Sequence, residues 1–438
     1  MTARPSIFRP FHSRALHALC LIGTLLVSLG YFAAAANAQT GRITPEIIDI
    51  SPDDDSVINR ARPDYDPQGI PAGGFRLFPT LSISGIYDDN VFRTTSNAGS
   101  DYYMEVVPQI DLRSQWSRNF LGLKLAAKHD HYARFASETR TEWTAAAAGR
   151  LDILTGTALS GSAQHKATFE ERNSPDQVNA AEPTPIQETQ ARLAFSYNPY
   201  RIGVRLSAEY DRITFDSTKL VGGGFLDNED RDRDEYFATL TALYEASPGY
   251  GLFLRSAYEK RVYDLQTGRA FGRDSQGYRV DAGVDFLLSR LIRGEAYAGY
   301  LRQDVENPAF ADLSGIDYGA ALRWFPTELI TVRLDAARTP GATTIAGASL
   351  ADHKSVSLGI DYEFRRNVIL QADAGYDNTN FEGAPRRDQT FSTALGVRYL
   401  LNPTLTASAK FTHESRDSTL SGFGYGDNTI SLGVSVHL

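Results

Sequence analysis

The chain has little cysteine, methionine or tryptophan: its 438 residues include one Cys, two Met and three Trp. The single Cys20 lies in an N-terminal apolar stretch, so the remainder has no thiol for a disulfide, a nucleophile or an iron–sulfur cluster. Only this stretch, 15–36, approaches the roughly 20 apolar residues of a membrane helix, which excludes a helical transporter. The formal charge of -9 argues against a nucleic-acid partner, which would demand a basic excess.

The N-terminus has the three parts of a cleaved signal peptide, predicted over 1–38. The apolar stretch follows a basic region and ends in Ala36-Asn37-Ala38, a small-x-small pattern that predicts cleavage before Gln39 and export. Cys20 sits within the apolar stretch, which disfavours a lipoprotein. The basic residues are Arg4, Arg9 and Arg14.

Residues 39–78 differ from both neighbours, because they are rich in Pro and Asp with one short apolar patch at 47–50. This composition predicts a flexible periplasmic N-terminal segment. A small plug or a docking arm for a partner is the alternative.

What the chain has in abundance is aromatic residues and glycine, with 22 Tyr, 23 Phe and 36 Gly. From residue 79 to 438 apolar and polar residues alternate, which predicts strands with two unlike faces. In the last of them, apolar Ile430, Leu432 and Val434 alternate with Ser431 and Gly433. The same pattern occupies 201–211, 278–288 and 356–364.

Turn signals divide this region regularly. Tight breakers such as Thr155-Gly156, Asn198-Pro199 and Asn402-Pro403 recur about every 40 residues, with longer polar loops between them. The alternation of short turns and long loops predicts about 18 strands. Long alternating strands with aromatics near both ends predict a lipid-facing wall with two aromatic belts.

The fold expected for 79–438 is therefore all-β: a transmembrane antiparallel up-and-down β-barrel of about 18 strands in the Gram-negative outer membrane, with short periplasmic turns and longer extracellular loops. Outer-membrane lipid and the barrel-insertion machinery are the partners this implies. Barrels of this class usually end in an aromatic residue, whereas this chain ends in His437-Leu438.

The opening of the repeat, Ile86-Tyr87-Asp88-Asp89-Asn90-Val91-Phe92, resembles the start of the "putative beta-barrel porin 2" family. Outside this stretch the resemblance over 79–438 rests on the strand pattern. Members are often associated with exopolysaccharide export, so the resemblance implies a secreted polysaccharide as the solute and periplasmic export components as partners.

A barrel of about 18 strands is too wide for its side chains to fill, so we expect a hydrated lumen lined by charges of both signs. The alternative for any single side chain is that it faces water on the wall and has no specific role. Inward parity also makes Tyr103, Phe253 and Tyr297 possible stacking platforms for sugar rings. The predicted pore-lining residues are Lys124, Lys128, Arg205, Arg255, Glu259, Asp281, Arg293, Glu295, Arg333, Asp335, Asp373 and Lys410.

We predict no catalytic residue, no cofactor and no metal site. His129 and His131 share the parity of outward leucines, and the acidic stretches at 88–90 and 227–234 are weak candidates for Ca²⁺. In the second stretch, ion pairs to its interleaved arginines are the alternative explanation. A rim enzyme built on His165, His353 and His413 has no local catalytic signature to support it.

The sequence thus favours a passive pore for polar solutes and leaves three functions open besides polysaccharide export. They are a general small-solute porin, a structural or adhesive barrel plugged by inward loops such as 171–187, and the rim enzyme.

Overall fold

A computed structural model describes residues 56–177, 180–265, 272–288 and 291–438. The predicted signal peptide and residues 39–55 lie outside them. Within the described part, no helix is long and apolar enough to cross a membrane. The only helical pieces described there are the 3-10 turns Ala136–Glu138 and Glu229–Arg231.

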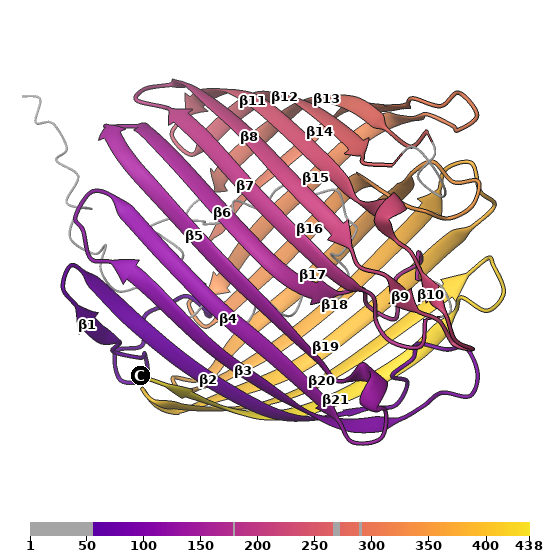
Figure 1. Cartoon of the computed structure of the whole chain (residues 1–438). Helices are drawn as coiled ribbons and strands as arrows, with labels where there is room; N and C mark the ends of the chain where they lie inside the picture. The colour runs from indigo at the N-terminus through magenta and orange to yellow at the C-terminus, as the bar shows by residue number, and fades with distance from the viewer. Residues whose placement is uncertain (1–55, 178–179, 266–271, 289–290) are drawn as a thin grey trace, which may run out of the picture.

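The architecture is a closed antiparallel barrel of 18 strands, which confirms the predicted fold (Figure 1). Its strands run from 12 to 16 residues. A three-residue strand, β1 (Ile70–Ala72), and a small hairpin of β9 (Thr218–Lys219) and β10 (Phe225–Leu226) accompany the wall. The wall strands are β2 (Phe75–Asp88), β3 (Asp101–Ser114), β4 (Phe120–Tyr132), β5 (Arg140–Leu154), β6 (Thr157–Phe169), β7 (Pro185–Tyr197), β8 (Ile202–Phe215), β11 (Arg233–Ser247), β12 (Tyr250–Tyr263), β13 (Ser275–Leu288), β14 (Ile292–Val305), β15 (Leu313–Thr327), β16 (Ile330–Gly341), β17 (Ala351–Arg365), β18 (Val368–Phe381), β19 (Arg387–Asn402), β20 (Leu405–Ser418) and β21 (Tyr425–His437).

The barrel closes where its first and last strands pair. The β2–β21 register runs from Thr80↔His437 to Asp88↔Thr429. Below the end of β21, β1 pairs with β2 from Ile70↔Leu77 to Ala72↔Phe75, and the C-terminus lies beside it (Figure 1). This short strand covers the edge that β2 would otherwise expose. The wall begins at Phe75 rather than at residue 79.

Alternation sets the two faces of the wall. In β21, Ile430, Leu432 and Val434 are exposed on the outside, while Ser431 and Gly433 are more buried on the inside. Exposed large apolar side chains recur in the same way on all the wall strands except β6 and β16, and an apolar outer band is the surface that a lipid bilayer would cover. The side chains that face the lumen are mostly polar.

The two ends of the barrel differ, as the turn pattern predicted. Tight turns join β5 to β6 and β7 to β8, and long loops such as 170–184 and 216–232 lie at the opposite end. Gly156 in the first of these turns has φ +72°, and a Cβ there would lie 2.4 Å from the carbonyl oxygen of Asn198. The turn therefore requires glycine.

Candidate pore

The structure places every predicted pore-lining residue on the inner face of the wall, on the strand positions opposite the exposed apolar ones. Most of them are paired. Arg255 lies 2.7 Å from Glu295, and Arg333 lies 2.9 Å from Asp373. Such pairs cancel charge locally, so the lumen wall is polar without a strong field of one sign.

Several partners of these residues were not predicted. Glu259 pairs with Arg261 and, at 3.5 Å, with Arg279, while Lys128 lies 3.2 Å from Glu142. Glu259 and Arg261 lie two positions apart on β12, whereas the other two pairs join neighbouring strands, so recognising those two requires the register as well as the parity of each strand. Arg293 lies over the ring of Phe325, 5.2 Å from its centroid.

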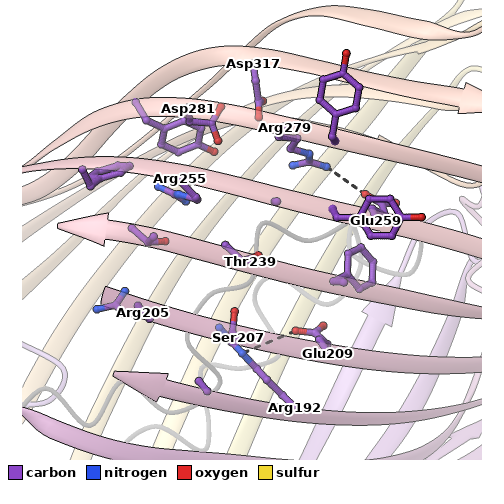
Figure 2. A pocket seen from close by; sticks show the side chains of 18 of the residues that line it. Arg192, Arg205, Ser207, Glu209, Thr239, Arg255, Glu259, Arg279, Asp281 and Asp317 are labelled. Carbon is purple, nitrogen blue, oxygen red and sulfur yellow. Dashed lines mark ion pairs between the residues drawn. The ribbon is translucent and has the colours of Figure 1, made fainter. Parts of the chain in front are cut away.

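One part of the lumen forms a cavity of about 350 Å³, lined by strands from β5 to β16 (Figure 2). Five predicted residues line it together with hydroxyl groups and arginines that the sequence did not single out. The predicted five are Arg205, Arg255, Glu259, Asp281 and Glu295, and the additions include Arg192, Ser207, Thr239, Thr241, Arg279 and Asp317.

The aromatic side chains in the lumen are not free platforms. Phe253 and Tyr297 point inward as predicted, but the Arg255 guanidinium lies 4.8 Å from one ring centroid and 4.5 Å from the other. Tyr103 stacks on Tyr132, with the ring centroids 4.5 Å apart. These ring faces are therefore occupied by neighbouring side chains and offer no open surface to a sugar.

The loop 170–184, which we call the crossing loop, leaves the wall between β6 and β7 and is fixed by two ion pairs at its start. Glu170 accepts hydrogen bonds from Arg231 at 2.6 and 2.9 Å, with both side chains 3% exposed. Arg172 binds Glu138 on the other side, at 2.5 and 2.9 Å. The loop is thus anchored to the loops on both its flanks.

Further along, the crossing loop contacts the opposite side of the barrel. Asp176 accepts hydrogen bonds from the Thr343 hydroxyl and the Thr344 amide, both at 2.8 Å, in the loop between β16 and β17. Asn173 donates to Glu414 of β20 at 3.1 Å. Because these strands stand almost opposite β6 and β7 in the closed strand order, the loop spans the lumen and narrows it.

The described part of the N-terminal segment lies inside the other end of the barrel. The Val57 amide donates to Thr331 of β16 at 2.8 Å, and its side chain packs on Ile369 and Leu400. Arg62 is buried and binds Glu363 of β17 at 2.8 Å. Residues 56–66 thus cover the inner faces of β16 to β19 near their short turns, a packing that the composition of this segment did not predict.

Arginines lie at both acidic stretches; in the first they pair with an acid of the stretch itself, and in the second with acids outside it. In 88–90, Asp88 and Asp89 meet Asp427, and Arg93 lies 2.8 Å from Asp427 and 3.2 Å from Asp88. Burial lowers the pKa of Arg93, but these carboxylates outweigh it and raise the pKa, so the cation stays charged. In 227–234, the arginines pair with Glu170 and with Glu235 rather than within the loop alone.

The histidines are bound by ordinary polar neighbours. His129 lies 2.8 Å from the Thr141 hydroxyl, and His165 lies 2.8 Å from that of Thr189. His353 contacts the Thr379 hydroxyl at 2.9 Å, and His413 contacts Asn428 at 2.9 Å. Each of the three rim histidines therefore has a local partner on an adjacent strand, and no two of them form a pair in these contacts.

The family model described as "Putative beta-barrel porin 2" matches residues 62–438. The chain belongs to this family. The porin is thus an outer-membrane β-barrel protein, and its family and fold are those of a channel rather than of an enzyme. No curated protein matches the porin.

Solved structures of several Pseudomonas aeruginosa proteins are similar to this chain. OpdO is 12% identical, with 83% of this chain and 97% of that chain covered and a TM-score of 0.42. OpdK in a structure with vanillate is 11% identical, with 83% and 98% covered and a TM-score of 0.43. OccK2 (OpdF) in complex with glucuronate is 12% identical, with 85% and 100% covered and a TM-score of 0.43.

Proposed function

We propose that the porin conducts small polar solutes through the part of the lumen lined by β5 to β16. The observation that carries this proposal is the path of the crossing loop, which contacts β20 through Asn173 and the β16–β17 loop through Asp176. These contacts lie on the side of β16 to β20, while the cavity of about 350 Å³ is lined by β5 to β16. A volume of that size suits a small solute.

A secreted polysaccharide is less well supported. A polymer needs a continuous wide passage and benefits from open aromatic surfaces, whereas here a loop spans the lumen and Arg255 covers the rings of Phe253 and Tyr297. The alternative is a plugged barrel that does not conduct, because the crossing loop spans the lumen. Conduction measurements separate these cases.

The test is reconstitution of the refolded porin into planar bilayers and into liposomes. Heat-modifiable migration on gels first confirms that the barrel is folded. We expect steady conductance, and liposome swelling in solutes up to the size of a monosaccharide but not in long oligosaccharides. Swelling in oligosaccharides supports the polymer route instead, and folded protein that neither conducts nor admits any solute overturns the proposal.

A further inference from the structure

One of the arginines that line the cavity differs from the others. Arg192, Arg255 and Arg279 all lie within 4.0 Å of a carboxylate in the same cavity, at 3.9, 2.7 and 3.5 Å (Figure 2). Arg205 of β8 has no hydrogen bond or ion pair with any residue of the described chain, and its side chain is exposed to the lumen. An exposed guanidinium with all its donors open is the group best suited to bind an anion from solution.

The surroundings of Arg205 are rich in hydroxyl groups. The strand register places Ser196 of β7 and Thr241 of β11 directly opposite it on the two sides. One position further along the inner face lies Ser207, opposite Thr239 (Figure 2). Asp285 attracts Arg205 from the same cavity without coming within ion-pair distance, so the guanidinium donors stay open. The neutral neighbours can donate to or accept from the hydroxyls of a solute.

The opposite side of the cavity carries two carboxylates beside Arg255 and Arg279. On β13 and β15, Asp281 and Asp317 line it, and the register aligns Asp281 with Arg255 and Thr241 in the row that begins at Arg205. A small solute in the cavity therefore meets the open guanidinium of Arg205 at one end, and carboxylates together with the paired cations Arg255 and Arg279 at the other. Carboxylates accept hydrogen bonds from hydroxyls and repel a second anionic group.

We infer that Arg205, with the hydroxyls of Ser207, Thr239 and Thr241, is a binding station for a small hydroxylated carboxylate anion. The solute's carboxylate faces Arg205, where the guanidinium can donate two parallel hydrogen bonds. Its hydroxyls face the Ser and Thr side chains and the acidic strands. This inference rests on the proposed function, because it names the solute class of the same lumen.

The test uses gluconate as the probe, sorbitol as its neutral counterpart, and the variant Arg205→Gln. Binding is measured by calorimetry on the detergent-solubilised full chain, and selectivity from the reversal potential in a potassium gluconate gradient. We expect about tenfold weaker gluconate binding in the variant, because one charge-assisted interaction is lost. The reversal potential should shift toward cation selectivity. Sorbitol binding should change little.

Arg212→Gln is the matched control, because Arg212 lies on the same strand and pairs with Asp264 and Asp234 outside the cavity. It removes the same charge and should leave gluconate binding unchanged. The inference is overturned if Arg205→Gln binds gluconate like the wild type, or if both probes weaken equally. Calorimetry measures binding without conduction. A bilayer that shows no conductance therefore refutes the proposed function but does not test this binding site.

Discussion

Arg62 donates a hydrogen bond to Glu363 at 2.8 Å across 301 residues of sequence, with side chains only 0% and 4% exposed. Burial lowers the pKa of Arg62 even though Glu363 attracts it, which indicates how far this guanidinium is removed from water. Removing one partner of such a pair leaves the other buried and uncompensated. The pair therefore fixes the N-terminal segment to the inner wall of the barrel.

The first prediction concerns this attachment. Arg62→Met should weaken the docking of residues 56–66 by about 3 kcal/mol, because Glu363 loses its buried partner. Val57 is fully buried in the docked segment, so Val57→Cys in a Cys20→Ser background reports its release. We expect faster labelling of this cysteine by a water-soluble maleimide when Arg62 is replaced.

Arg60→Met is the control for that experiment. Arg60 also approaches Glu363, but at 3.7 Å and with its side chain 22% exposed, so its loss should cost less than about 1 kcal/mol. Labelling at the same rate in both variants would show that the buried pair does not hold the segment.

A second prediction tests the two faces of the wall with neighbouring residues of β21. Leu432 is 63% exposed on the outer face, and Ser431 lies beside it on the inner face. Leu432→Arg places a charge in lipid near mid-strand and should cost about 2–4 kcal/mol of folding stability in vesicles. Ser431→Arg should cost much less, and urea unfolding titrations measure both changes. Equal losses would contradict the assigned orientation of the strand.

The barrel was predictable from the sequence because its governing signal is local. A strand between lipid and water alternates with a period of two, so residues such as Leu432 and Ser431 reveal their faces from adjacent positions. The same parity placed Arg205 and Asp281 in the lumen. Their partners were not predictable, because the pair Arg255–Glu295 joins β12 to β14 across an intervening strand and depends on the register of both.

The contacts of the loops and of the N-terminal segment were harder to predict from the sequence, because they too depend on distant residues. The Pro- and Asp-rich composition of 39–78 indicates a flexible segment, yet Arg62 and Val57 find partners about 300 residues away. Asp176 likewise meets Thr343 across the lumen. No periodic pattern marks such contacts, since each depends on the closed shape of the barrel.

The third prediction is that the crossing loop limits conductance through its contact with the β16–β17 loop. Asp176→Ala removes the acceptor of two hydrogen bonds, each worth about 1.5–3 kcal/mol when one partner is charged. The loop should detach at this point, and single-channel recordings should show a larger and noisier conductance. Asp304→Ala removes an exposed pair with Arg302 at 2.6 Å on β14 and serves as the control. An unchanged conductance in Asp176→Ala would mean that the crossing loop is not the narrowest point.

The fourth prediction is a loosening of the crossing loop in acid. Burial raises the pKa of Glu171, but Arg140, Lys128 and Arg93 outweigh it and hold the pKa below its usual 4.5. A carboxylate with a lowered pKa contributes stability that is complete above 4.5 and is lost as the pH falls through the lowered value. Conductance noise should therefore stay constant from about pH 7 to 5 and rise below about pH 4.

The variant Glu171→Gln isolates this carboxylate from the other acids of the lumen. It should be noisy already at neutral pH and show no further step in acid, because the ion pair with Arg140 at 3.5 Å is absent throughout. Glu182→Gln, in the same loop, removes only an exposed pair with Lys219 at 3.9 Å and should keep the acid step. Glutamine at position 171 has no carboxylate to protonate, so an acid step of equal size in Glu171→Gln would assign the transition to another carboxylate.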